Sequence, residues 1–329
     1  MRLFACVLTI ATCTACSSND AASGTTTGTG GSSTSSAGGG GNAGSGGGAG
    51  TACELSNVQV VSQEPTHVVE RFSYPSGDLR IEAEVCRPPG RGPFPVLIWN
   101  HGGFQGIGAG DRQLCAAFAQ NAGWAMVMSE YRGEGGSDGP IEVCLGEVDD
   151  ALALAECTTD QSWADATRMQ MAGLSHGGCI TLRAAQRGAP IVAAVDIFGP
   201  TDWKAEHAFW TAELAAAPNG PFAAAYQLLL DVMETAAGGP PSSAGAAYDA
   251  RSPLNFDVDG YGGSLLIVHG VDDALVPPEQ SCALVEASRG FEARHYDASA
   301  TTPLPTPPAG CESSSLIWLA TPKPSPAWP

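Results

Sequence analysis

The sequence predicts an α/β fold with a mostly parallel sheet covered by helices on both faces. Short, continuously apolar runs alternate with helix-like runs along most of the chain, and this alternation is typical of parallel strands that are buried on both sides. Glycine-rich loops directly follow several of the apolar runs. Because ligands bind beyond the carboxyl ends of the strands in such sheets, we expect the chemistry of the chain at that edge.

The expected elements alternate in order along the chain. Residues 80–85 alternate polar and apolar side chains, which predicts an antiparallel strand with one exposed face. Longer apolar runs predict buried strands, and the segments between them predict helices. The expected buried strands are 95–99, 124–128, 168–172, 191–197 and 264–268, the last strand is 291–297, and the expected helices are 113–121, 148–156 and 178–185.

Length favours one large domain over residues 52–300. Within it, an Ala- and Gly-rich insertion at 199–251 predicts a helical cap over the site. The aromatic side chains of this insertion also have a plainer role, which is to pack it onto the body. Residues 301–329 hold eight prolines, which a helix interior rejects. We therefore expect an atypical Pro-rich tail in which only 313–320 forms a helical turn or two.

The N-terminal residues predict export. Residues 1–16 combine a positive charge at Arg2 with an apolar run, and Cys16 follows small residues, as in a bacterial lipoprotein signal. Residues 17–51 are almost entirely Gly, Ser, Thr, Ala and Asn, which predicts a disordered linker. We expect a signal peptide, a lipid anchor on Cys16 as the first mature residue, and a place in the bacterial cell envelope, at the outer membrane or the surface. The alternative is a secreted or periplasmic protein.

The composition argues against several partners and cofactors. The chain of 329 residues has a net charge of −19, and its 15 Lys and Arg residues form no basic run. Nucleic acid and anionic membrane faces are therefore unfavourable partners. The cysteines after Cys16 include no C-x-x-C pair and the six histidines are scattered, so we expect neither a metal site nor a cofactor.

Eight cysteines follow Cys16, and an even number in an exported chain predicts disulfide bonds. The pairs to test first are Cys144–Cys157 and Cys282–Cys311. Cys179 lies in an expected helix, where a buried thiol is the simpler interpretation.

The run Gly173-Leu174-Ser175-His176-Gly177 joins an expected strand to an expected helix. Glycines on both sides of a serine permit a sharp strand-to-helix turn, because side chains there would collide with the neighbouring elements. Such a turn exposes the serine hydroxyl, and the helix N-terminus behind it favours developing negative charge. Ser175 is therefore the candidate nucleophile. A chance match is the alternative in a chain with 42 glycines, but the flanking elements and the other motifs disfavour it.

A serine nucleophile also needs an oxyanion hole, and the loop 100–104 can contribute to one. The glycines of this loop let backbone N–H groups approach a substrate oxygen. The N–H groups of Gly103 and of His176, the residue after the candidate nucleophile, are the expected donors. We expect His101 in the same loop to be a structural histidine rather than a base.

The candidate acid lies in the loop 269–277, which again directly follows a buried strand. A carboxylate on this turn can reach a histidine on the next turn. Asp273 is the candidate, because it completes the pattern H-G-x-x-D-x-x-V-P. Its neighbour Asp272 is the fallback, although capping the following helix is the simpler role for it.

Taken together, these motifs resemble the α/β-hydrolase superfamily, nearest to its prolyl oligopeptidase and dienelactone hydrolase-like branch. The resemblance runs from about Phe72 to Asp297 and also includes the segments 93–95, 131–137 and 251–254. It implies an α/β-hydrolase fold and a serine hydrolase without a cofactor.

The resemblance further implies that Ser175 is the nucleophile, that Asp273 is the acid, and that Gly103 and His176 form the oxyanion hole. The substrate would be a small-molecule ester or amide. Oligopeptidases of this branch carry a large propeller domain before the hydrolase domain, whereas only about forty residues lie between the expected linker and the sheet here. An esterase is therefore favoured over a serine peptidase.

The base is where the chain departs from this family, which places a histidine on the loop after the last strand. No histidine follows His295, which lies about six residues too early and inside that strand. Three explanations compete. His295 acts from a shifted strand end; or the chain is an impaired or inactive surface lipoprotein that binds a ligand or partner; or a frameshift near Ala300 has replaced the true tail. The abrupt change of sequence character favours the frameshift, and His295 is the only candidate base.

Overall fold

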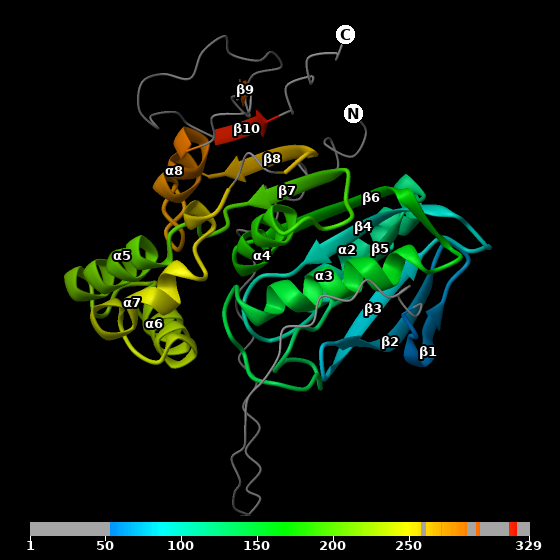
Figure 1. Cartoon of the computed structure of the whole chain (residues 1–329), viewed down its shortest axis with the longest axis horizontal. Helices are drawn as coiled ribbons and strands as arrows, with labels where there is room; N and C mark the ends of the chain where they lie inside the picture. Colours follow the sequence, from blue (N-terminus) through cyan, green and yellow to red (C-terminus); the bar gives the residue numbers. More distant parts are fainter. Residues whose placement is uncertain (1–52, 258–260, 271, 288–293, 297–315, 321–329) are drawn as a thin grey trace, which may run out of the picture. The chain divides into compact units, whose positions relative to one another are not determined.

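The computed structural model describes residues 53–257, 261–270, 272–287, 294–296 and 316–320, the last two ranges by their backbone alone (Figure 1). All of them belong to one compact unit, Cys53–Pro329. The expected signal peptide and linker lie outside the described residues, so their boundaries stay predictions.

The described strands form one ten-stranded sheet in the order β1-β2-β3-β5-β4-β6-β7-β8-β10-β9. Their bounds are β1 Ser56–Gln63, β2 Val68–Ser76, β3 Leu79–Arg87, β4 Phe94–Asn100, β5 Ala125–Ser129, β6 Ala164–Leu174, β7 Ala193–Ile197, β8 Ser264–His269, β9 Arg294–Tyr296 and β10 Leu316–Ala320. The five central strands from β5 to β8 are parallel, and β1 to β3 join them antiparallel. The expected α/β fold with parallel central strands is confirmed, but the sheet as a whole is mixed, because β9 and β10 also pair antiparallel.

Helices cover both faces of this sheet. Their bounds are α2 Ala109–Ala117, α3 Gly146–Thr159, α4 His176–Gln186, α5 Trp203–Ala216, α6 Ala223–Ala237, α7 Pro241–Asp249 and α8 Glu279–Ala287. The connections β4–α2–β5 and β5–α3–β6 run in opposite directions along the sheet, so right-handed crossovers place α2 and α3 on opposite faces. Helices α3 and α4 pack side by side against β6 (Figure 1).

Helix α2 and the tail differ from the expectation. Helix α2 begins at Ala109 rather than 113 and continues as a π-helical turn, Phe118–Ala122. Its start is fixed by Asp111, whose carboxylate accepts the Gly108 N–H at 2.8 Å. In the tail, the segment for which we expected a helical turn forms strand β10, which pairs antiparallel with β8 from Leu316 to Ala320.

The disulfide bonds correct the expected pairing. Cys144 is bonded to Cys179 and not to Cys157, so Cys179 is not a thiol. The other two bonds among the described pairs join Cys53 to Cys157 and Cys86 to Cys115. Cys282 is also disulfide-bonded, but its expected partner Cys311 lies outside the described residues, so that pair stays a prediction.

The insertion at 199–251 folds into helices α5, α6 and α7 (Figure 1). Asp202 starts α5 by accepting the N–H groups of Lys204 and Ala205. At the far end, buried Arg251 donates to three backbone carbonyls, which belong to Glu142, Ala236 and Ala247. Arg251 therefore ties α6 and α7 to the segment before α3.

Candidate active site

The loops that carry the sequence motifs meet at one edge of the sheet. The strand register places Asn100 of β4 beside Gly173 of β6 and places Ile197 of β7 beside Val268 of β8. Because these strands are parallel, the loops that follow them lie at the same carboxyl edge. The structure thus brings the elbow, the glycine loop and the acid loop to one edge.

Ser175 lies on the turn between β6 and α4 with φ 53° and ψ −122°. This is a sparsely populated backbone conformation for a residue with a side chain, and such strain is stored at functional sites. The turn is held by hydrogen bonds from the Ser175 N–H to the Ile197 carbonyl, at 2.9 Å, and from the Gly178 N–H to the Ser175 carbonyl, at 2.9 Å.

The elbow has no room for side chains at its glycines. A Cβ atom at Gly173 would lie 2.1 Å from the carbonyl oxygen of Gly177, and one at Gly178 would lie 2.3 Å from Asp196 Oδ1. Strand β6 and helix α4 therefore approach each other closely enough to force the sharp turn at Ser175. This is the nucleophile-elbow geometry that the pentapeptide predicts.

The glycine loop after β4 lies directly against the elbow. A Cβ atom at Gly102 would be 2.6 Å from the Leu174 side chain and 3.3 Å from Ser175 Cβ. Gly103 adopts φ 72°, which glycine reaches without strain. Among the hydrogen bonds of the described residues, none has the Gly103 N–H as its donor. This N–H is therefore available to a ligand oxygen.

His101 supports this loop, in agreement with its expected structural role. Its ring is fully buried, and Nδ1 lies 3.1 Å from the Gly102 carbonyl oxygen. Burial lowers the pKa of His101 to about 4, so the ring is neutral. As a neutral donor to Gly102, it fixes the peptide unit that carries the Gly103 N–H.

Two buried carboxylates hold the far end of the loop. Glu134 accepts the Gly106 N–H, and Glu130 Oε2 accepts the Ile107 N–H at 2.7 Å. Burial raises the pKa of Glu134 to about 8. Residues 131–137 belong to the segments that carry the family resemblance, but their sequence predicted no role; a glutamate within a glycine-rich run was the available signal.

The His176 side chain bridges two loops of the site. Its Nε2 lies 2.9 Å from the Cys144 N, and its Nδ1 lies 3.2 Å from the Gly103 carbonyl oxygen. Burial lowers the pKa of His176 to about 4. As the first residue of α4, His176 also has a backbone N–H without an intrahelical partner. We expected only this backbone group to take part; the role of the ring was missed.

The acid loop is ordered around Asp273. Its Oδ1 accepts the N–H groups of Leu275 at 2.9 Å and Val276 at 3.0 Å. Its Oδ2 lies 3.9 Å from His269 Nε2. Oδ1 thus fixes the turn, and Oδ2 is left to accept a hydrogen bond from a base.

The helical insertion contacts this acid loop. The Trp210 indole donates to the Leu275 carbonyl at 2.7 Å, and the Tyr226 hydroxyl donates to the Ala274 carbonyl at 2.6 Å. Glu206 of α5 is fully buried, and neither of its carboxylate oxygens has a hydrogen-bond partner among the described residues. Burial, and then the negative charge of Asp273, raise the pKa of Glu206 well above its usual value. No sequence motif marks this buried acid.

No described histidine is hydrogen-bonded to Ser175. His269 has both ring nitrogens occupied, by Ser281 Oγ at 2.6 Å and by the Val276 carbonyl at 2.9 Å. His295 lies in β9, beside Trp318 of β10, which in turn lies beside Ile267 of β8. The side chain of His295 lies outside the described part of the chain, so its role as the base stays a prediction.

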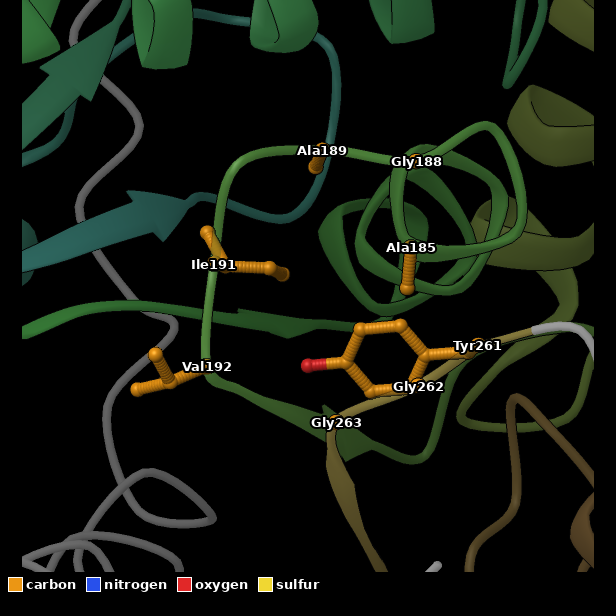
Figure 2. A pocket seen from close by; sticks show the side chains of 8 residues that line it. All are labelled: Ala185, Gly188, Ala189, Ile191, Val192, Tyr261, Gly262 and Gly263. Carbon is orange, nitrogen blue, oxygen red and sulfur yellow. The ribbon is translucent and has the colours of Figure 1, made fainter. Parts of the chain in front are cut away.

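An open cavity of about 340 Å³ lies between the end of α4 and the segment before β8 (Figure 2). Its lining residues are Ala185, Gly188, Ala189, Ile191, Val192, Tyr261, Gly262 and Gly263. These residues precede β7 and β8, so the cavity lies at the amino edge of the sheet, opposite Ser175. Within the described ranges, no group of three His, Cys, Asp or Glu side chains could hold a metal ion, and no helix is long and apolar enough to cross a membrane.

Comparison with known families gives a match over residues 76–251 to the model of the X-Pro dipeptidyl-peptidases, the S15 family. This range spans more than half of the 329 residues. The chain belongs to the S15 family. This S15 chain is also 26% identical over 249 residues to a probable dipeptidyl-aminopeptidase B of Penicillium rubens. The aligned residues cover 71% of this chain and 25% of that protein. The chain thus spans about a quarter of the length of that relative.

Solved structures share the fold of this S15 chain. Acetyl xylan esterase 1 from Thermoanaerobacterium superposes with a TM-score of 0.56 at 19% identity, over 72% of the chain and 78% of that structure. The acylaminoacyl peptidase of Pyrococcus horikoshii gives 0.52 at 23% identity, over 68% and 35%. Prolyl oligopeptidase B from Galerina marginata gives 0.51 at 18% identity, over 68% and 31%. The fold is that of the α/β hydrolases.

Proposed function

We propose that this chain is an exported serine hydrolase that cleaves small esters or amides. Ser175 Oγ attacks the carbonyl carbon, and the N–H groups of Gly103 and His176 stabilise the oxyanion. Asp273 orients the base that takes the serine proton and returns it to the leaving group. The observation that carries the proposal is the strained Ser175, with φ 53°, at the end of β6 and beside the Gly102–Gly103 turn.

The names of the similar proteins support this class of bond. An acetyl xylan esterase cleaves an acyl ester, whereas an acylaminoacyl peptidase and an X-Pro dipeptidyl-peptidase cleave amides. Both reactions pass through a tetrahedral oxyanion, which the same pair of backbone donors can stabilise. We favour the ester as the better substrate, because its leaving group needs less help from a general acid.

The identity of the general base distinguishes the proposed hydrolase from the alternative, an impaired hydrolase with a binding role. Strand β9, which carries His295, is four positions from β6 in the sheet order, or about 19 Å at 4.7–4.9 Å per strand. A histidine side chain inside a strand does not span this distance. This observation favours, as a second candidate, an impaired hydrolase that binds a ligand or partner. Loss of one triad member leaves about 10³–10⁴-fold catalysis over water.

Export is supported by the cross-links. Three disulfide bonds join described cysteines, and such bonds persist in oxidising compartments. We propose a signal peptide ending before Cys16 and a lipid on that cysteine. Metabolic labelling with a fatty-acid analogue tests the lipid: label should enter the wild-type protein and be lost in Cys16→Ser. Equal labelling of both would contradict it.

The activity is tested with p-nitrophenyl acetate and alanyl-prolyl-p-nitroanilide, on wild type, Ser175→Ala and His295→Ala. Ester turnover lost in both variants would assign His295 as the base. Turnover lost in Ser175→Ala and kept in His295→Ala would support the proposed hydrolase activity and exclude His295 as its base. No turnover above Ser175→Ala, in protein that is folded by circular dichroism, would favour the binding role. Labelling by a fluorophosphonate probe reports the nucleophile independently.

A further inference from the structure

The His176 ring lies between the backbone of Cys144 and the backbone of Gly103, which carries one of the two proposed oxyanion donors. A backbone N–H can only donate, so the Cys144 N–H at 2.9 Å makes Nε2 an acceptor. A carbonyl oxygen can only accept, so the Gly103 oxygen at 3.2 Å makes Nδ1 a donor. Both contacts hold together only for a neutral ring with its proton on Nδ1.

The Nε2 side of the ring is anchored rigidly. Cys144 is bonded through its sulfur to Cys179, in the same helix as His176. The turn that presents the Cys144 N–H is ordered by Glu147, whose carboxylate accepts the N–H groups of Glu142, Val143 and Leu145.

The plane of the ring is set by aromatic contacts. The Phe104 ring lies at a centroid distance of 4.8 Å, and Tyr131 packs edge-on at 6.1 Å. His176 is buried, at 2% exposed, so water does not compete for either nitrogen. With one nitrogen anchored and the plane fixed, the Nδ1–H can point only toward the Gly103 carbonyl.

Fixing that carbonyl fixes part of the oxyanion hole. The peptide unit between Gly103 and Phe104 is planar, and Gly103, at φ 72°, has no side chain to restrict its own conformation. The ring thereby sets the position of the Gly103 backbone relative to the His176 backbone N–H. A misplaced donor loses most of its effect, since oxyanion stabilisation depends on preorganised geometry.

We propose that the imidazole of His176 is a positioning residue, which holds the two oxyanion donors at their working separation through its Nδ1–H bond to Gly103. The proposal rests on the proposed function of Ser175. It assigns to the side chain of His176 a role separate from that of its backbone N–H.

Two variants each keep one of the two hydrogen bonds of the His176 ring and remove the other. In His176→Asn the amide nitrogen can take the place of Nδ1 and donate to Gly103, but the acceptor for Cys144 is lost. In His176→Gln the longer side chain can place an oxygen near Nε2 and accept from Cys144, but the donor to Gly103 is lost. The matched controls are His67→Asn and His67→Gln, because His67 contacts only Thr66 and Gln120 among the described polar side chains.

The proposal predicts opposite orders for activity and stability. In p-nitrophenyl acetate hydrolysis, His176→Gln should lose about 10- to 100-fold in kcat, below the full cost of one donor. Its KM should stay within about threefold, because the oxyanion forms only in the transition state. His176→Asn should lose less kcat than His176→Gln and yet unfold at the lower temperature, because it leaves a buried N–H unpaired. Both His67 variants should match wild type.

Failure of the positioning role and failure of the proposed function would give different results. Equal kcat values in the two His176 variants, or kcat values that follow their melting temperatures, would overturn the positioning role while Ser175-dependent turnover of wild type stands. Absence of that turnover in wild type would instead remove the proposed function. The ring itself is read without activity, by a long-range ¹H–¹⁵N spectrum in which signals lost in His176→Asn identify His176. A neutral ring protonated on Nδ1 supports the proposal, and a proton on Nε2 contradicts it.

Discussion

Gly177 packs so closely against Asn100 that a Cβ atom on the glycine would lie 2.0 Å from the carbonyl oxygen of Asn100. Backbone cannot yield as a flexible side chain can, so Gly177→Ala must displace α4 from β4. We expect it to lower the free energy of unfolding by about 3 kcal/mol or more and to abolish Ser175-dependent turnover. Urea unfolding measures this.

The matched control for that substitution is Gly110→Ala. Gly110 lies in α2, and an added Cβ would meet nothing within 4 Å. Alanine in a helix is favoured over glycine by roughly 0.5–1 kcal/mol, so this variant should be as stable as wild type or more so. Equal unfolding midpoints for the two variants would contradict the close packing of Gly177.

The Cys144–Cys179 bond should affect activity as well as stability, because Cys144 also contacts the His176 ring. Replacing both cysteines by alanine should cost about 4 kcal/mol, from the loop-entropy model for a separation of 35 residues. The same replacement at Cys86 and Cys115, separated by 29 residues, should cost about as much. Only the first pair should lower turnover per folded molecule; equal turnover in both would refute this.

The buried Glu206 should make stability depend on pH. Its raised pKa means that the folded chain keeps this proton after the unfolded chain has released its own. Stability from this group is therefore present at acid pH and lost as the pH rises above the unfolded pKa of about 4.3. Glu206→Gln should gain stability relative to wild type between pH 5 and pH 9, measured by thermal unfolding. Exposed Glu156, changed to Gln, should show no such trend.

Arg251 should be among the costly polar residues to remove. Its guanidinium satisfies three carbonyl oxygens and is 3% exposed. Arg251→Met would leave these three acceptors buried and unpaired. Each unpaired buried acceptor lowers the free energy of unfolding by about 1–3 kcal/mol. Arg187, half-exposed and paired with the exposed Asp149, is the control, and Arg187→Met should change stability by less than about 1 kcal/mol. Equal losses of unfolding free energy in the two variants, measured by chemical denaturation, would contradict this role of Arg251.

The central strands were predictable because each is a continuous apolar run, as in the buried Val96, Leu97 and Ile98 of β4. The start of α2 was not, since Gly106, Gly108 and Gly110 suggest a loop and hide the cap that Asp111 makes with Gly108. Local patterns thus predict an element well where burial is uniform and poorly where a side-chain contact decides its start.

The same division holds at the site. The motifs around Ser175, Gly103 and Asp273 are local in sequence, and the structure brings their loops to one edge of the sheet. Glu134 accepts the N–H of the distant Gly106, and Glu206 lies close enough to the distant Asp273 for its charge to raise the Glu206 pKa. No pattern along the chain marks such contacts. Disulfide pairing is likewise decided by the fold, which brings Cys144 to a cysteine 35 residues away.

Strand β10 has a consequence for any shortened form of the protein. Its five residues, Leu316–Ala320, pair with Leu265 to His269 of β8. A chain cut at residue 300 would leave the backbone groups on that edge of β8 unpaired, and an open edge of apolar sequence is a template for other chains. Truncation of the proline-rich tail should therefore yield a protein that self-associates edge to edge. By covering that edge of β8, strand β10 should protect the domain from such association.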